Sequence, residues 1–135
     1  MKKSLIALLM ALFALPSASA QKAAPESEKQ LVRLSKISVD PARLGEYNAY
    51  LREEIEASLR LEPGVLALYA VAEKERPHEV TILEIYADEA AYRSHIATPH
   101  FQKYKQGTLD MVRSLELIDA APLLPGSLLR QTVPD

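Results

Sequence analysis

Residues that could take part in acid–base chemistry gather in one stretch of the sequence. Glu84, Tyr86, His95 and His100 fall within seventeen positions. Glu84 and Tyr86 are two residues apart in EVTILEIY, so an extended strand would direct both side chains to one face. That face also carries apolar residues, among which a carboxylate costs free energy unless it is paired. Glu84 is therefore either a structural residue that bonds within the core or part of a functional site.

The two histidines of this stretch are expected on consecutive helical segments. His95 follows Tyr92 by three residues on the same helical face, and His100 falls in the first turn after Thr98-Pro99. Because the N-terminal end of a helix disfavours a positive charge, we expect His100 to be neutral and available as a base. A packing or capping role is the structural alternative for each ring. His78 lies in the charged turn KERPH, where we expect it to be solvated.

Several other kinds of site are not indicated by the sequence. His95 and His100 are five residues apart, a spacing that does not place two metal ligands on one helical face, and no third ligand stands nearby at metal spacing. There is no glycine-rich phosphate loop, no Gly-x-Ser-x-Gly motif and no dinucleotide fingerprint. The sequence has no cysteine, which excludes disulfides, thiolate metal ligands and cysteine nucleophiles. We therefore expect neither a metal nor a cofactor.

Hydrophobic periodicity locates the elements that must position these residues. A strand from Gln30 to Val39 ends at Asp40-Pro41, which is typical of a helix start with Asp40 as N-cap. The helix that follows carries the apolar stripe Leu44, Tyr47, Leu51, Ile55 and Leu59. After the break at Glu62-Pro63-Gly64, strands over 65–72 and 79–86 and a short helix over 89–96, capped by Asp88, are expected. The remaining elements are a strand over 114–120 and, before it, a helix from Thr98-Pro99 with the stripe Phe101, Tyr104, Thr108, Met111, Val112 and Leu115.

The order of these elements is β-α-β-β-α-β. It predicts an α+β, ferredoxin-like fold in which one four-stranded antiparallel sheet carries both helical units on one face. A sheet covered on one face should alternate apolar and polar residues. The strand over 65–72 instead has Val65, Ala67, Tyr69 and Val71 on one face and further apolar residues on the other. We therefore expect a homodimer in which two sheets pack face to face.

The two ends of the chain are expected to lie outside this domain. Residues 1–20 combine Lys2-Lys3, an apolar run from Leu5 to Leu15 and a small-residue end, as in a secretory signal peptide cleaved near Ala20-Gln21. The run is too short to anchor the chain in a membrane, so we expect an exported protein, periplasmic or secreted. Residues 21–29 are expected to be a disordered lead-in, 30–121 the domain, and 122–135 a proline-rich arm that crosses onto the partner subunit.

The charge balance argues against a nucleic-acid partner. Loss of Lys2 and Lys3 leaves 14 basic residues against 18 acidic ones. A phosphate footprint needs clustered basic residues, and the widest cluster here is the sparse set Lys103, Lys105 and Arg113. Since the exported chain has no disulfides, its stability must come from its core or from a partner subunit.

The stretch LEIYADEAAY from Leu83 to Tyr92, followed by His95 and by Thr98-Pro99-His100-Phe101, resembles the signature of the antibiotic biosynthesis monooxygenase (ABM) family. The motif Glu62-Pro63-Gly64-Val65 and the opening strand-Asp-Pro-helix are also similar, and the resemblance covers Leu31 to Pro125. It implies a ferredoxin-like chain that dimerises through its sheets, the dimeric α/β barrel.

The family resemblance implies several activities. Similar proteins include quinol monooxygenases that use no metal, flavin or haem, tailoring oxygenases of aromatic polyketides, haem-degrading members and an isomerase of a phosphorylated quorum-sensing sugar. The haem-degrading type uses an Asn, a Trp and a His, for which Ser35, His95 and Lys105 are the nearest equivalents here. The predicted export disfavours the isomerase, although Asp88 to Ala91 and Thr98 to His100 are close to its motifs. The resemblance thus favours cofactor-independent oxidation of a quinol or another small phenol with dioxygen.

For that reaction we expect His95 or His100 to be the base and Glu84 to orient it. The expected substrate-binding residues are Tyr86, Tyr69, Tyr92 and Phe101. Two alternatives stay open at this point: a dimer that binds a small molecule without turnover, and an isomerase of a small, sugar-like signal molecule. Convergence of the candidate residues on one pocket would favour an enzyme.

Overall fold

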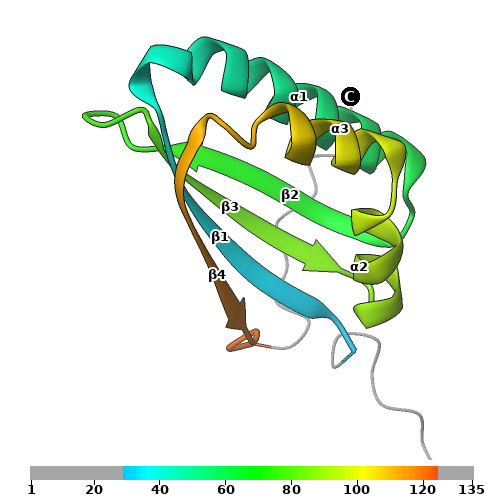
Figure 1. Ribbon diagram of the computed structural model, residues 1–135. Coiled ribbons are helices and arrows are strands. Elements are labelled where there is room, and N and C mark those ends of the chain that lie inside the picture. Colours follow the sequence, from blue (N-terminus) through cyan, green and yellow to red (C-terminus); the bar gives the residue numbers. More distant parts are fainter. Residues whose placement is uncertain (1–28, 125–135) are drawn as a thin grey trace, which may run out of the picture.

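The computed structural model describes residues 29–124, so the predicted signal peptide (1–20), nearly all of the lead-in and the arm beyond residue 124 lie outside the described part. The elements in chain order are β1 (Leu31–Val39), η2 (Pro41–Arg43), α1 (Leu44–Leu61), β2 (Val65–Ala72), β3 (Glu79–Tyr86), α2 (Glu89–Ile96), α3 (Pro99–Gly107) and β4 (Val112–Ala120) (Figure 1). This order confirms the predicted β-α-β-β-α-β arrangement, with α2 and α3 as the second helical unit. No helix in residues 29–124 is long and apolar enough to cross a membrane.

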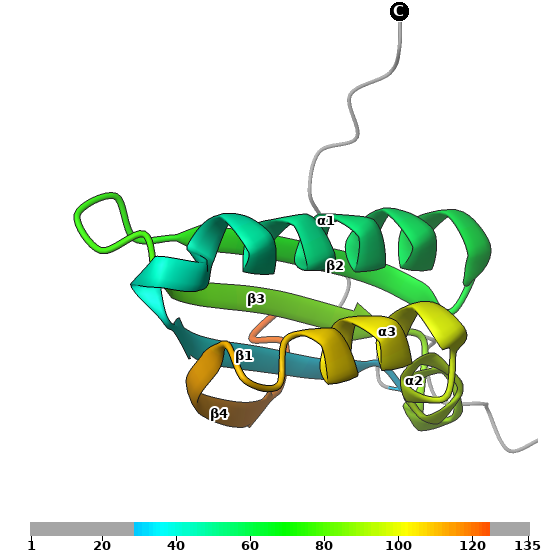
Figure 2. The same ribbon diagram turned by 45° about the horizontal axis from the view of Figure 1, so that its top comes forward.

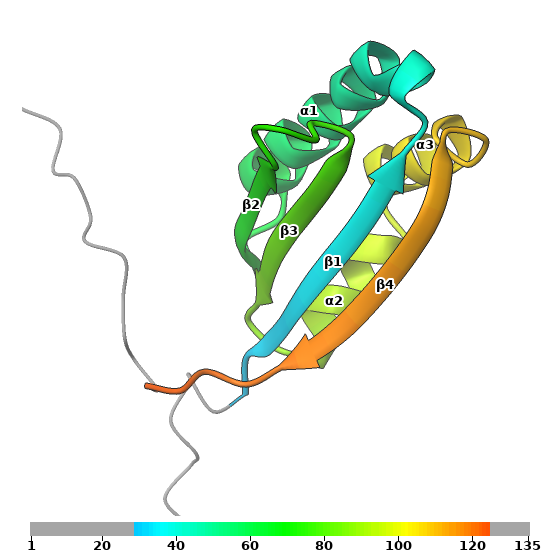
Figure 3. The ribbon, with the colours of Figure 1, turned by 90° about the vertical axis from the view of Figure 1, so that its left-hand side faces the viewer.

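The four strands form one antiparallel sheet in the order β2-β3-β1-β4. Helices α1 and α3 lie side by side on one face of the sheet, and α2 lies at the end of the sheet where β3 finishes (Figure 2). The opposite face, which we call the outer face, has no helix of the described chain over it (Figure 3). This two-layer arrangement is the ferredoxin-like α+β fold.

Side-chain caps fix where the helical segments begin, as the sequence predicted. The Asp40 carboxylate accepts a hydrogen bond from the backbone N–H of Ala42, and that of Asp88 accepts one from Ala91 at 2.7 Å. Thr98 Oγ1 accepts the N–H of Phe101 at 3.3 Å at the start of α3. Asp40 caps the single turn η2, which leads into α1, rather than α1 itself.

The main core lies between α1 and the covered face of the sheet, which we call the inner face. Tyr47 and Leu51 of α1 are buried there against Val39 of β1 and Ile82 of β3. Met111, in the turn before β4, completes this cluster and is 1% exposed. Burying apolar side chains of this size contributes roughly 1.5–3 kcal/mol each, which holds α1 firmly on the sheet.

The predicted helical stripe from Phe101 to Leu115 is wrong in its second half. Helix α3 ends at Gly107, and the stripe's last two residues, Val112 and Leu115, belong to β4. The residues beyond Gly107 gain a ladder with β1, which a longer helix would lose. Glycine also suits the end of α3, where a Cβ would lie 2.4 Å from the Tyr50 ring and the ring would have to move.

The predicted strict alternation along β2 is also wrong near its start. The register with β3 shifts between Val65 and Ala67, as at a β-bulge. Val65 and Leu68 are consequently both buried, whereas Leu66 between them is 47% exposed. The bulge reverses which residues of β2 face the helices, so alternation counted from Val65 gives the wrong face for its neighbours.

Candidate active site

A cavity of about 240 Å³ lies between the inner face of the sheet and the helices. All four strands and all three α-helices contribute to its wall, which is mainly apolar and aromatic with a few polar groups. Five of the residues predicted from the sequence line it: Glu84, Tyr86, Tyr92, His95 and Phe101. The volume is below the range of about 300–1,000 Å³ typical of sites for drug-sized ligands, which indicates a small ligand.

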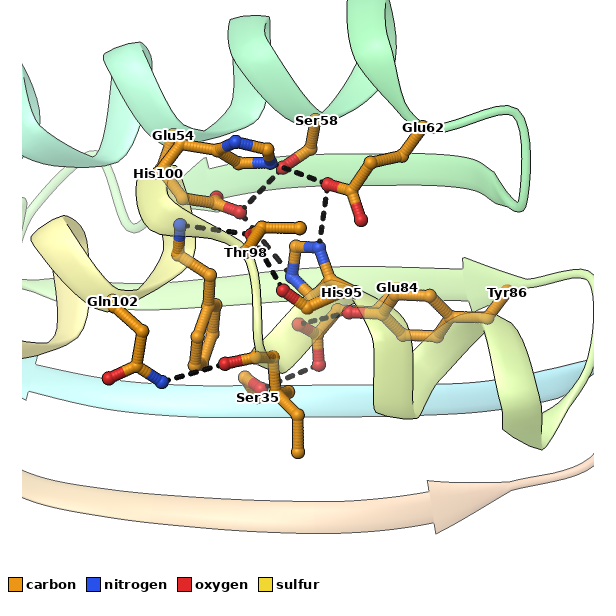
Figure 4. Close-up of polar contacts among 12 residues, drawn as sticks. Ser35, Glu54, Ser58, Glu62, Glu84, Tyr86, His95, Thr98, His100 and Gln102 are labelled. Carbon is orange, nitrogen blue, oxygen red and sulfur yellow. Dashed lines mark hydrogen bonds and ion pairs between the residues drawn. The ribbon is translucent and has the colours of Figure 1, made fainter.

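Glu84 is held on the inner face by two hydroxyl donors. Ser35 Oγ of β1 donates to one carboxylate oxygen at 2.9 Å, and the Tyr86 hydroxyl donates to the other at 3.2 Å (Figure 4). Burial raises the pKa of the Glu84 carboxyl above its ordinary value, although both hydrogen bonds favour the charged form. Burial likewise raises the pKa of Tyr86, which therefore stays a neutral donor. The sequence prediction that Glu84 and Tyr86 share a face is confirmed.

Arg33 is the cross-strand neighbour of Glu84 but does not pair with it. Its guanidinium instead donates to Asp119 at 2.8 Å and lies 4.5 Å from the centre of the Tyr92 ring. Within residues 29–124, Glu84 makes no ion pair shorter than 4 Å. The carboxylate thus faces the cavity with hydroxyl partners alone, a setting that strengthens it as a base.

His95 is 1% exposed, and both its ring nitrogens face carboxylates. Nδ1 lies 3.1 Å from Oε2 of Glu62, and Nε2 lies 3.4 Å from Oε1 of Glu54. The ring packs against the rings of Tyr86 and Phe101, whose centres are 5.3 Å and 5.0 Å away. His95 therefore forms part of the cavity wall, with its polar atoms already engaged.

Glu54 is a buried carboxylate of the cavity wall that sequence reasoning missed. It lies on the buried face of α1, where it accepts a hydrogen bond from Ser58 at 2.8 Å. Burial raises the pKa of Glu54. The hydrogen bond from Ser58 and the nearby His95 lower this pKa, but by less than burial raises it. Its spacing was a usable signal, because Glu54 follows Leu51 by three residues and Tyr47 by seven on the helical repeat.

His100 does not line the cavity, so the structure does not bring it together with Glu84. Its Nε2 lies 2.6 Å from Oε2 of Glu62, and the ring reaches a shallow surface groove along α1. Burial alone would raise the pKa of Glu62, but hydrogen bonds from His100 and His95 outweigh it and hold that pKa below its ordinary value. Glu62, like Glu54, was not identified from the sequence, since only the tertiary fold brings it to the histidines.

Tyr69, a predicted substrate-binding residue, lies on the other side of the sheet. It pairs in register with Leu83 on the outer face and is 66% exposed, away from the cavity. A different tyrosine, Tyr104 of α3, lines the cavity instead. Its hydroxyl lies 2.7 Å from that of Tyr47, whose pKa is raised by burial to about 12. The sequence placed Tyr104 only in an apolar stripe.

Comparisons with known proteins agree with this architecture. Residues 31–107 match the family described as antibiotic biosynthesis monooxygenase. The chain is 75% identical to a candidate antibiotic biosynthesis monooxygenase of known structure from Bacteriodes thetaiotaomicron, with 77% of this chain and 99% of that chain covered and a TM-score of 0.76. A candidate monooxygenase from Lactobacillus acidophilus is 29% identical over 66% of this chain and 42% of its own, with a TM-score of 0.65.

A more distant structure shows the same fold. It is a candidate antibiotic biosynthesis monooxygenase from Nitrosomonas europaea, 19% identical, with a TM-score of 0.68 over 73% of this chain and 95% of that chain. No curated protein matches the chain. The match to the family covers more than half of the sequence and spans the elements from β1 to α3, whereas β4 lies beyond it. The chain belongs to the antibiotic biosynthesis monooxygenase family.

Proposed function

We propose that the protein is a cofactor-independent monooxygenase that oxidises a small quinol or related phenol with dioxygen in the cavity beside Glu84. Membership of the monooxygenase family supports the type of reaction. The volume of about 240 Å³ and the aromatic wall support a substrate of one or two rings.

The observation that carries this proposal is the partly buried carboxylate of Glu84, which has hydroxyl partners and no ion pair within residues 29–124 and faces a mainly apolar cavity. We assign Glu84 as the base, in place of the histidines favoured by the sequence. His100 lies outside the cavity, and the two ring nitrogens of His95 already face Glu62 and Glu54. A carboxylate whose pKa is raised by burial removes a phenolic proton more readily than an exposed one does.

The chemistry needs only a base, a dry cavity and dioxygen. Glu84 takes the hydroxyl proton of the quinol, and the resulting anion gives one electron to dioxygen to form a substrate radical and superoxide. The two radicals combine to form a C–O bond at a free ring carbon, and the resulting peroxide takes back the proton held by Glu84 to become a hydroperoxide. Loss of water from the hydroperoxide then gives a hydroxyquinone, so one oxygen atom enters the product and the other leaves as water. The quinol supplies all four electrons, and no further reductant is required.

Neighbouring side chains suit the positioning of such a substrate. The rings of Phe101 and Tyr92 offer apolar faces for stacking, and the neutral hydroxyl of Tyr104 can donate to a substrate oxygen. Leu115 and Leu117 of β4 line the cavity and are more than half exposed, because no helix of residues 29–124 lies over this strand (Figure 2). We infer that the substrate enters from this side.

The test is oxygen uptake with a panel of reduced quinols, such as 1,4-naphthalenediol and its methyl derivatives, combined with mass analysis of the product. We expect a product that has gained one oxygen atom from ¹⁸O₂. Glu84→Gln should lower kcat by about 10²–10⁴-fold, the usual contribution of a positioned base. His78→Gln, a change in the distant charged turn, serves as the control and should leave the rate unchanged.

Two results would contradict the proposal. Equal rates for the wild type and Glu84→Gln would remove Glu84 as the base. No uptake with any quinol, together with a small molecule retained through purification and detected by native mass spectrometry, would favour binding without turnover.

A further inference from the structure

We propose that Glu62, His95 and His100 form a binding site for one divalent transition-metal ion of the zinc class. One carboxylate oxygen and one ring nitrogen of each histidine all lie within 4.8 Å of one another. His95 Nδ1 lies 3.1 Å and His100 Nε2 lies 2.6 Å from the same oxygen of Glu62 (Figure 4). Two imidazoles and one carboxylate are ligands that favour Zn²⁺, Co²⁺ or Ni²⁺ over Mg²⁺ and Ca²⁺.

The three ligands come from three elements that meet at one corner of the molecule. Glu62 is the C-cap residue directly after α1, His95 lies in the last turn of α2, and His100 lies in the first turn of α3. The link between the two histidines is short and fixed, because Thr98 Oγ1 donates to the carbonyl oxygen of His95 at 2.7 Å. A site built on helix ends of this kind is held by the fold itself.

The surroundings of His95 match those of a metal-bound histidine. Its second nitrogen, Nε2, lies 3.4 Å from Oε1 of Glu54, which in turn accepts a hydrogen bond from Ser58. Histidines that bind a metal usually direct their other N–H at a carboxylate, which fixes the tautomer and orients the ring. In the tautomer that carries its proton on Nε2, beside Glu54, the lone pair of Nδ1 is available to bind an ion next to Glu62.

To hold an ion the cluster needs a movement of His100, whose ring nitrogen lies within 4.8 Å of that of His95. Metal–ligand distances of about 2.0–2.2 Å and tetrahedral angles place ligand atoms roughly 3.3 Å apart. The 3.1 Å contact of His95 is already close to that separation. The 2.6 Å contact of His100 must lengthen, by less than ~1 Å for this geometry. The His100 side chain is 15% exposed and reaches the surface groove, so it can move and gives the ion a path to the site.

Three protein ligands leave a fourth position open for water or another small ligand. The inference is independent of the proposed oxidation, because Glu84, the assigned base, is not among the ligands. The sequence could not indicate this site, since Glu62 lies 33 residues before His95 and joins the histidines only in the folded chain.

Calorimetric titration of the purified, metal-free chain with ZnCl₂ tests the site, and the chain must carry no histidine tag. We expect one ion per chain, and Glu62→Gln and His100→Gln should each weaken binding by at least tenfold. Glu54→Gln, which removes the carboxylate behind His95, should weaken binding about 10–100-fold. His78→Gln is the matched control, because the His78 ring lies beside Glu79 and is not part of the cluster. This variant should bind zinc with the affinity of the wild type.

A measurement on the wild type alone guards against variants that fail to fold. In ¹⁵N spectra of the histidine rings, ZnCl₂ should shift His95 Nδ1 and His100 Nε2 and leave His78 unchanged. The absence of saturable zinc binding, or binding that survives both Glu62→Gln and His100→Gln, would overturn the metal site. Neither result bears on the proposed oxidation, which oxygen uptake by the Glu84 variant tests separately.

Discussion

The basicity of Glu84 depends on the hydrogen bonds made by Arg33, its neighbour across the strand pair, which bonds to Asp119. Arg33 stands directly across the strand pair from Glu84, and a guanidinium in contact would lower the pKa of that carboxyl. Asp119 and the Tyr92 ring hold Arg33 elsewhere. The carboxylate makes no ion pair within residues 29–124, and the charges of His95 and Arg33 offset only part of the effect of burial, which raises its pKa. The burial that makes Glu84 a stronger base therefore also costs stability.

The free-energy cost of burying the Glu84 charge predicts that the wild type and Glu84→Gln differ in stability by an amount that depends on pH. The pKa of Glu84 is higher in the folded chain than in the unfolded one, so the folded state binds the extra proton and stability falls as pH rises through this interval. Glu84→Gln removes this partly buried charge and should raise the melting temperature at pH 7. The gain should shrink as the pH is lowered and vanish below about 4.5, the ordinary carboxyl pKa.

Thermal unfolding of the two proteins between pH 4 and pH 8 measures this difference. Glu46→Gln, a change at an exposed carboxylate of α1 that pairs with Arg43, is the comparison and should show no such gain. A wild type more stable than Glu84→Gln at pH 7 would contradict the burial argument.

At the scale of single residues, the sequence predicts what a strand or helix repeat determines. The shared face of Glu84 and Tyr86 follows from alternation and is confirmed. The bulge in β2 moved Tyr69 to the outer face, and a turn between α2 and α3 directed His100 away from the cavity. Glu54 was predictable in principle from its helical spacing. Glu62 was not, because its partners are set by packing between three elements.

At the scale of the elements, α2 lies close to the start of β2, and this contact holds His95 and His100 near Glu62. Gly64 allows this close contact, because a Cβ there would lie 2.6 Å from the Cβ of Ala91. The Gly64 carbonyl also accepts a hydrogen bond from the N–H of Ala87 at 2.8 Å. A larger residue would push α2 away from the end of α1.

Gly64→Ala should therefore destabilise the fold by about 1–3 kcal/mol, as overpacking usually does. Gly45→Ala in α1 is the matched control, since nothing lies within 4 Å of its Cβ; alanine there should stabilise by up to ~1 kcal/mol. Urea unfolding of both variants gives these free energies. Equal effects of the two substitutions would show that the Ala91 contact does not constrain α2.

The elements were predicted well where local signals decide. The strands over 65–72 and 79–86 and the helix over 89–96 have the predicted bounds, because turn residues and the Asp88 cap delimit them. The end of α3 was not predicted, because an apolar stripe of period 3.6 continues by coincidence into β4. There the ladder with β1, a contact between distant parts of the chain, decided the structure.

At the scale of the whole molecule, the outer face of the sheet explains the expectation of a homodimer. A row of apolar residues in register crosses all four strands there: Tyr69, Leu83, Leu34 and Ile118. Nothing in residues 29–124 packs over this row as a helix layer. We propose that a second copy covers it, which would bury the exposed Tyr69 and the three partly exposed residues beside it.

Leu83→Lys places a charge in the centre of that row and should convert a dimer into a monomer. Leu109→Lys is the control, because Leu109 is 73% exposed in the turn before β4 and away from the sheet. Analytical ultracentrifugation over a concentration series measures the mass of each protein. A wild type that is monomeric at every concentration would contradict the proposed dimer.

Two residues of β4 line the cavity without contributing to the hydrophobic core, because no helix of residues 29–124 lies over this strand. Leu115 and Leu117 line the cavity but are 58% and 52% exposed, whereas Leu51 and Ile82 of its wall are buried members of the core. Substitutions at exposed positions usually change stability by less than about 0.5 kcal/mol. Under the proposed function, substitutions at these two positions would change substrate preference and leave the stability of the fold almost unchanged.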